Sequence, residues 1–153
     1  MKLFKLRYIC LVLCFSLIPF IDAVDEKEDF IYDLSLATQG VSVSQYNTGI
    51  NYFTGRGIDK DLEKAVYWYQ RASEQGHSKA PFNIAIIYAN GDIKGKNFSL
   101  ALEYFRLSAD RGNKEAKEFL KKINTISDLS LEDALEKFCC PNPLTHSMVD
   151  KEL

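Results

Sequence analysis

The chain has 153 residues, of which 46% are hydrophobic and 26% are charged, and its formal net charge is -2. This length gives room for one domain, and the hydrophobic content is too high for a disordered chain. The slightly acidic balance argues against a nucleic-acid-binding protein, which usually carries a basic surplus.

Residues 1–23 have the composition of a secretory signal peptide. A basic start precedes an apolar run over residues 8–21, and Ala23 supplies a small residue at the end. A membrane anchor is the alternative, but fourteen residues span roughly 21 Å at a rise of ~1.5 Å each, against a hydrocarbon core of ~30 Å. We therefore expect residues 1–23 to be removed and the mature chain not to insert into a membrane.

The last four residues resemble the Lys-Asp-Glu-Leu retrieval signal of the endoplasmic reticulum, with the first two positions exchanged. They are Asp150, Lys151, Glu152 and Leu153. A solvated charged tail is the alternative interpretation. Together with the leader, this tetrapeptide favours the endoplasmic reticulum lumen and a retrieval receptor as one partner. If the tail is not read as a signal, the protein is secreted.

A leading helix is expected in the N-terminal flank, residues 24–43, from Asp29 to Ala37. Its apolar side is formed by Phe30, Ile31 and Leu34. Gln39 and Gly40 break it.

The central part of the chain repeats itself with a period of 36 residues. Identical pairs include Asn47 with Asn83, Tyr52 with Tyr88, Gly55 with Gly91, Ala65 with Ala101 and Gly76 with Gly112. A constant period between 20 and 50 residues indicates a repeat architecture. The units are residues 44–79, residues 80–115 and a partial copy over residues 116–123.

Each unit has the pattern of a helical hairpin. We expect helix N-caps at Asp61, Ser78 and Asn97, and helix ends at Gly76 and Gly112. The predicted fold is all-α, a short right-handed solenoid of antiparallel helix hairpins. Such stacks need capped ends, and helices from the two flanks are the candidates.

The first unit resembles the sel-1-like repeat, a relative of tetratricopeptide repeats. The residues that carry this resemblance are Gly49, Tyr52, Gly55-x-Gly57, Lys64-Ala65, Trp68-Tyr69 and Gly76, and the unit departs from the pattern mainly at Ser44 and Thr48. The second unit keeps most of the pattern but lacks the second turn glycine, which predicts a differently shaped turn. The resemblance covers residues 44–123. It implies a scaffold that binds other proteins, including luminal adaptors of quality control and degradation.

The C-terminal flank has two parts. Residues 124–140 are expected to include a capping helix that starts at Ser130, and residues 141–153 form a tail with two prolines. The apolar face of this helix is formed by Leu131, Ala134, Leu135 and Phe138.

Residues with catalytic or metal-binding spacing are nearly absent from the sequence. The two histidines, His77 and His146, have no spacing that builds a metal site with cysteine. We therefore expect no enzyme activity, no cofactor and no metal.

After removal of the leader, Cys139 and Cys140 are the remaining cysteines. Adjacent cysteines lack the two-residue spacer of redox pairs, so an inert pair or an intermolecular disulfide is favoured. A thiol-redox factor that uses this pair is the alternative class of function.

Two further sites follow from the residues. Asn97-Phe98-Ser99 is an acceptor sequence for N-glycosylation. The first helices of the two units are expected to expose a strip that could hold an extended peptide, with ordinary solvated polarity as the alternative. The strip is Asn47, Asn51, Thr54, Asn83, Ile87 and Asn90. The predicted function is a non-enzymatic adaptor for luminal quality-control proteins or client polypeptides.

Overall fold

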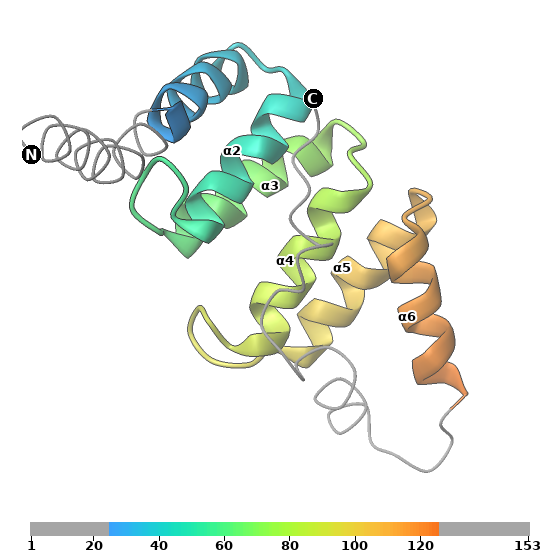
Figure 1. Ribbon diagram of the computed structural model, residues 1–153. Coiled ribbons are helices and arrows are strands. Elements are labelled where there is room, and N and C mark those ends of the chain that lie inside the picture. The colour runs from blue at the N-terminus through green and yellow to red at the C-terminus, as the bar shows by residue number, and fades with distance from the viewer. Residues whose placement is uncertain (1–24, 126–153) are drawn as a thin grey trace, which may run out of the picture.

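The computed structural model describes residues 25–125, which are entirely helix and turn (Figure 1). The described part of the chain begins within a helix, called the first helix below, which is described over residues 25–38. It is followed by α2 (Ser42–Thr54), α3 (Leu62–Glu74), α4 (Lys79–Asn90), α5 (Phe98–Asp110) and α6 (Lys114–Asn124). Within this part of the chain, none of the helices combines the length and apolarity needed to cross a bilayer. The leader, the cysteine pair, His146, the helix expected from Ser130 and the retrieval tetrapeptide lie outside the described residues.

Two helical hairpins form the centre of the molecule, α2 with α3 and α4 with α5 (Figure 1). The apolar faces of these helices build two adjoining clusters, one around Tyr46 and Tyr69 and one around Phe82 and Phe105. Because α4 contributes to both clusters, it joins the hairpins into one continuous core. The predicted all-α stack of hairpins is confirmed.

The helix before each unit ends in the same type of turn. In the α3–α4 turn, the Gly76 N–H donates to the Ser73 carbonyl at 2.9 Å and the His77 N–H donates to the Ala72 carbonyl at 3.1 Å. This pair of bonds is a Schellman motif, which places a glycine at positive φ just after the helix. The same bonds close the turns at Gly40 and Gly112, and all three glycines have φ between 88° and 95°. The first helix therefore ends at the same position of the 36-residue repeat as α3 and α5.

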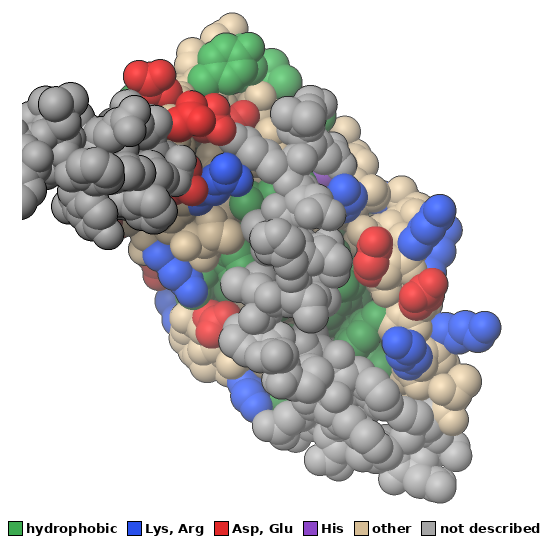
Figure 2. All heavy atoms as spheres, in the orientation of Figure 1, with side chains coloured by type: hydrophobic (Ala, Val, Ile, Leu, Met, Phe, Trp, Pro, Cys, Tyr) green, Lys and Arg blue, Asp and Glu red, His purple; other side chains and the backbone are tan. Residues whose placement is uncertain are grey.

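This position in the repeat makes the first helix equivalent to the second helix of a hairpin. In α3 and α5 the equivalent face is apolar, whereas in the first helix it is acidic. Counting back by 36 residues puts Glu26 at the position of Leu62 and Phe98, Asp29 at that of Ala65 and Ala101, and Asp33 at that of Tyr69 and Phe105. Figure 2 shows the acidic side chains gathered over this helix. Asp29 is exposed and Asp33 is buried against the next unit, so the described stack begins with a helix that is more polar than α3 and α5, as suits the end of a solenoid.

Burial in the first helix differs from the prediction at one position. Phe30 is buried and Leu34 is partly buried, as expected, but Ile31 is 56% exposed. Asp33 is buried instead, because it occupies the position from which Tyr69 and Phe105 face the next unit.

The last helix, α6, ends the repeat pattern at the other end of the stack. Its residues Ala116 and Phe119 pack against α5, as the first residues of α4 pack against α3. The face that α4 turns toward α5 has polar equivalents in α6. These are Glu118, Lys121, Lys122 and Thr125, in place of Phe82, Ala85, Ile86 and Ala89, and all four are exposed. Figure 2 shows Lys and Arg side chains along this edge. The described stack thus has a polar helix at each end.

The α2–α3 turn and the α4–α5 turn begin and end in the same way but differ in their middle residues. Gly55 and Gly91 end the first helices at φ 79° and 78°. The second turn then has positive φ at Lys94 and Gly95, whereas the first has it at Gly57. The prediction of a differently shaped second turn is confirmed.

Two of the three predicted N-caps are confirmed. Asp61 Oδ1 accepts from the Lys64 N–H, and Asn97 Oδ1 accepts from the Leu100 N–H, both at 3.0 Å. The prediction for Ser78 is wrong, because its backbone is already helical and its side chain makes no cap bond. His77 takes this role instead, with Nδ1 accepting from the Ala80 N–H at 3.2 Å.

Candidate functional site

Three equivalent junctions join the second helix of one unit to the first helix of the next. At the first junction, the carboxyl of Asp33 accepts bonds from the side-chain amides of Asn47 and Asn51, each at 3.4 Å. At the third junction, the rings of Phe105 and Phe119 lie 4.2 Å apart. The first junction is therefore polar with hydrogen bonds between its side chains, and the third is apolar.

The middle junction, between α3 and α4, pairs Tyr69 with Asn83. Tyr69 is fully buried, and in the described part of the chain its Oη has no hydrogen-bond partner. Asn83 lies close to this hydroxyl and acts on its pKa as a side-chain hydrogen-bond partner does, although the contact falls short of full hydrogen-bond geometry. Because a buried polar group without a partner loses ~1–3 kcal/mol relative to a satisfied one, this junction is the exception among the three.

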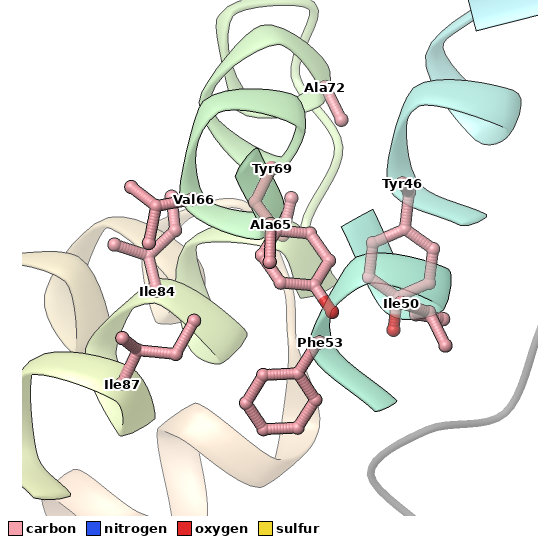
Figure 3. Close-up of a cluster of buried hydrophobic side chains, with 10 residues drawn as sticks. Tyr46, Ile50, Phe53, Ala65, Val66, Tyr69, Ala72, Ile84 and Ile87 are labelled. Atoms are coloured by element: carbon pink, nitrogen blue, oxygen red, sulfur yellow. The ribbon is translucent and has the colours of Figure 1, made fainter. Parts of the chain in front are cut away.

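The position of the Tyr69 ring is fixed by the helix opposite it. Gly49 of α2 lies directly against the ring, and a Cβ added there would come within 2.5 Å of Tyr69 Cδ1. The rings of Tyr46 and Tyr69 lie 5.7 Å apart, and Figure 3 shows the Tyr69 hydroxyl turned toward Tyr46 and Phe53. The hydroxyl therefore cannot turn away to find another partner without moving the core.

Burial, with a contribution from Tyr46, raises the pKa of the Tyr69 hydroxyl well above its usual range, while Asn83 acts in the opposite direction. The hydroxyl stays protonated at physiological pH and offers one donor and one acceptor. Asn83, 6% exposed, adds a carboxamide, which has the same donor and acceptor groups as a peptide bond. Of the two groups only the Asn83 carboxamide reaches the surface, where it can bond to a peptide group, and the Tyr69 hydroxyl lies buried beneath it.

The six residues of the predicted strip are placed differently by the structure. Ile87 is fully buried in the core, so its assignment to an exposed strip is wrong. Asn47 and Asn51 are also buried, and their amides bridge α2 to Asp33 of the first helix. Thr54 is exposed, Asn90 is partly exposed, and Asn83 lies at the middle junction. Partner binding stays a prediction, centred on Asn83.

Sequence reasoning missed the special character of Tyr69. The shift of 36 residues aligns Tyr69 with Phe105, which treats both as core aromatics. The extra hydroxyl is visible in that alignment, but whether it finds a partner depends on the three-dimensional packing.

Elsewhere, the described residues show little that catalysis could use. They contain no cluster of three or more His, Cys, Asp or Glu side chains able to hold a metal ion. His77 caps α4 and stacks on Tyr46 with ring centroids 4.2 Å apart. A shallow hollow beside the α2–α3 turn is lined by Glu26, Lys27, Gly55, Gly57, Ile58 and Asp59 and brings together no such set of groups.

Both hairpins match a known family of repeats. The family model described as "Sel1 repeat" matches residues 42–77 and 78–113, two residues earlier than the boundaries predicted from sequence. Both hairpins match the Sel1-repeat model over their whole length. No curated protein matches the sequence.

Two solved structures share the Sel1-repeat architecture. A Sel1 repeat protein from Oxalobacter formigenes is similar over 65% of this chain and 40% of its own, with 32% identity and a TM-score of 0.55. The protective antigen c5321 of uropathogenic Escherichia coli, which displays an SLR fold, is similar over 73% of this chain and 25% of its own. Its identity is 22% and its TM-score 0.58, so this likeness concerns the fold alone. Sel1 repeats generally mediate protein–protein interaction, and two segments of this chain are similar to them.

Proposed function

We propose that this protein is a non-enzymatic adaptor that binds an extended segment of another polypeptide at the middle junction. The observation that carries the proposal is the Tyr69 hydroxyl, which has no hydrogen-bond partner in the described structure while the other two junctions are either bonded or apolar. A partner peptide group that bonds to Asn83 and, through a local opening between α3 and α4, reaches the buried Tyr69 hydroxyl would satisfy both polar groups, an advantage that the free protein lacks.

The proposal includes a place in the endoplasmic reticulum lumen, where the partners are quality-control components or client polypeptides. The leader and the final tetrapeptide of the sequence support it. Removal of the leader is also compatible with the fold, because the first helix has an acidic outer face and does not need an apolar helix before it.

Tyr69→Phe tests the binding site. The substitution removes only the hydroxyl, and because this group has no partner, we expect the free energy of unfolding to stay within about 1 kcal/mol of wild type or to rise. Partner capture should fall. The measurements are urea denaturation and quantitative affinity capture of the tagged full-length protein from luminal extract, compared with wild type.

A matched control and a second variant sharpen this experiment. Tyr67 is 50% exposed on the outer side of α3, so Tyr67→Phe should change neither quantity. Tyr69→Phe combined with Asn83→Leu converts the junction into an apolar one like that of Phe105 and Phe119, and it should fold well and bind poorly. If Tyr69→Phe costs 1–3 kcal/mol of stability, the hydroxyl has a partner in the free protein and the proposal fails.

Deletion of residues 150–153 tests the location. We expect the intact protein to remain in the cells and the truncated protein to reach the medium, because the tetrapeptide is the proposed retrieval signal. The measurement is the ratio of secreted to cellular protein after a chase. Equal secretion of both forms would identify a secreted binding module instead.

A further inference from the structure

We propose that Asn97 carries an N-linked oligosaccharide. The inference rests on the luminal location proposed above and goes beyond it, since entry into the lumen does not by itself make a given asparagine a modification site. Asn97 is followed by Phe98 and Ser99, and of all the asparagines in the sequence it alone has Ser or Thr two positions later without an intervening proline.

The geometry at Asn97 leaves its side-chain nitrogen available. The backbone N–H of Asn97 donates to the Tyr88 carbonyl at 2.9 Å, and Oδ1 accepts from the Leu100 N–H at 3.0 Å. Within the described residues, Nδ2 makes no hydrogen bond. Both Asn97 and Ser99 are exposed. Figure 1 shows the α4–α5 turn, which leads into Asn97, projecting from the edge of the stack. An oligosaccharide on Nδ2 therefore points into solvent.

The modification preserves the helix cap. In the transfer, Nδ2 forms a bond to the anomeric carbon of the sugar, the bond from that carbon to the lipid diphosphate of the donor breaks, and Nδ2 loses one proton. Nδ2 keeps its second hydrogen, and Oδ1 is unchanged. The bond from Leu100 to Oδ1 therefore remains, and α5 keeps its N-terminal cap.

Comparison with two other helix caps shows that capping alone does not explain the asparagine at position 97. Asp61, at the same position in the first repeat, accepts from Lys64 with the same 3.0 Å distance. An aspartate therefore caps this type of helix equally well. Asn113 caps α6 through the Ala116 N–H at 2.7 Å, but it is only 5% exposed and lies in no acceptor sequence.

These caps supply the test. The full chain is expressed in a cell with a secretory pathway, as wild type and as Asn97→Asp, which keeps the cap of Asp61, and Ser99→Ala, which keeps Asn97 but removes the acceptor hydroxyl. We expect the wild type alone to shift in electrophoretic mobility after treatment with peptide N-glycosidase. Mass spectrometry should find the resulting aspartate at position 97. The unmodified variants should melt at the same temperature as the deglycosylated wild type.

Protease protection in microsomes, measured on the same samples, separates the two proposals. Wild-type protein that is protected and lacks its leader but shows no mobility shift would overturn glycosylation and leave the luminal location standing. Protein that is not protected overturns both. A shift that persists in Ser99→Ala places the sugar elsewhere and also overturns the assignment to Asn97.

Discussion

Gly49→Ala should lower the free energy of unfolding by about 1–3 kcal/mol, although the same change inside a helix usually raises it by about 0.5–1 kcal/mol. The sign reverses because the new Cβ would lie 2.5 Å from Cδ1 and 2.6 Å from Cε1 of Tyr69. That ring is fully buried and cannot move aside without disturbing α3 or α4. Urea denaturation of the two proteins gives the difference directly.

A double-mutant cycle tests the cause of this loss. Tyr69→Leu removes the ring that the methyl group meets, so Gly49→Ala should cost much less in that background. The two effects should therefore be strongly non-additive. Equal costs in both backgrounds would mean that the alanine acts through something other than Tyr69.

Gly57→Ala should release the first helix from the stack. Gly57 has φ +69° and lies against that helix, so an added Cβ would overlap the carbonyl oxygen of Glu26 and come within 3.0 Å of Phe30 Cβ. The neighbour is backbone, which has little freedom to move. We expect a loss on the order of 1–3 kcal/mol from the close contact, in addition to the cost of positive φ. Hydrogen exchange should show lost protection in residues 25–38.

Gly55→Ala is the matched control. Gly55 has a similar φ of +79°, but its added Cβ would meet nothing nearer than Lys60 Cβ, at an ordinary 3.4 Å. This variant should therefore show the cost of positive φ alone and keep the first helix protected. If both variants behave alike, contact with the first helix is not what requires a glycine at position 57.

Much of the fold follows from short-range information in the sequence. Asp61 and Asn97 cap helices through bonds to backbone groups three residues away, and Gly76 ends a helix through bonds within the same turn. Such local interactions are set by residue type and spacing, which is why the 36-residue alignment predicts them. The hairpins follow because each apolar face needs a partner.

The parts that the sequence alone does not predict depend on contacts between units. Asp33 is buried because it faces Asn47 and Asn51 of the next unit, and no local pattern marks a carboxyl for burial. Extending the alignment upstream, where Gly40 matches Gly76, is the signal that could have placed the first helix in register. The unbonded hydroxyl of Tyr69 likewise depends on Gly49 and Asn83, which lie far from it in the sequence.

The three glycine turns at positions 40, 76 and 112 make the length of the molecule adjustable in whole steps. Each of these turns has the same hydrogen bonds. A second copy of residues 41–76 placed directly after Gly76 would therefore begin and end at a turn of the same geometry. Both polar end helices would stay in place. The added junction would pair Tyr69 with the duplicated Asn47, an asparagine in the position of Asn83. Lengthening the chain in this way would multiply the proposed binding site along with the scaffold that carries it.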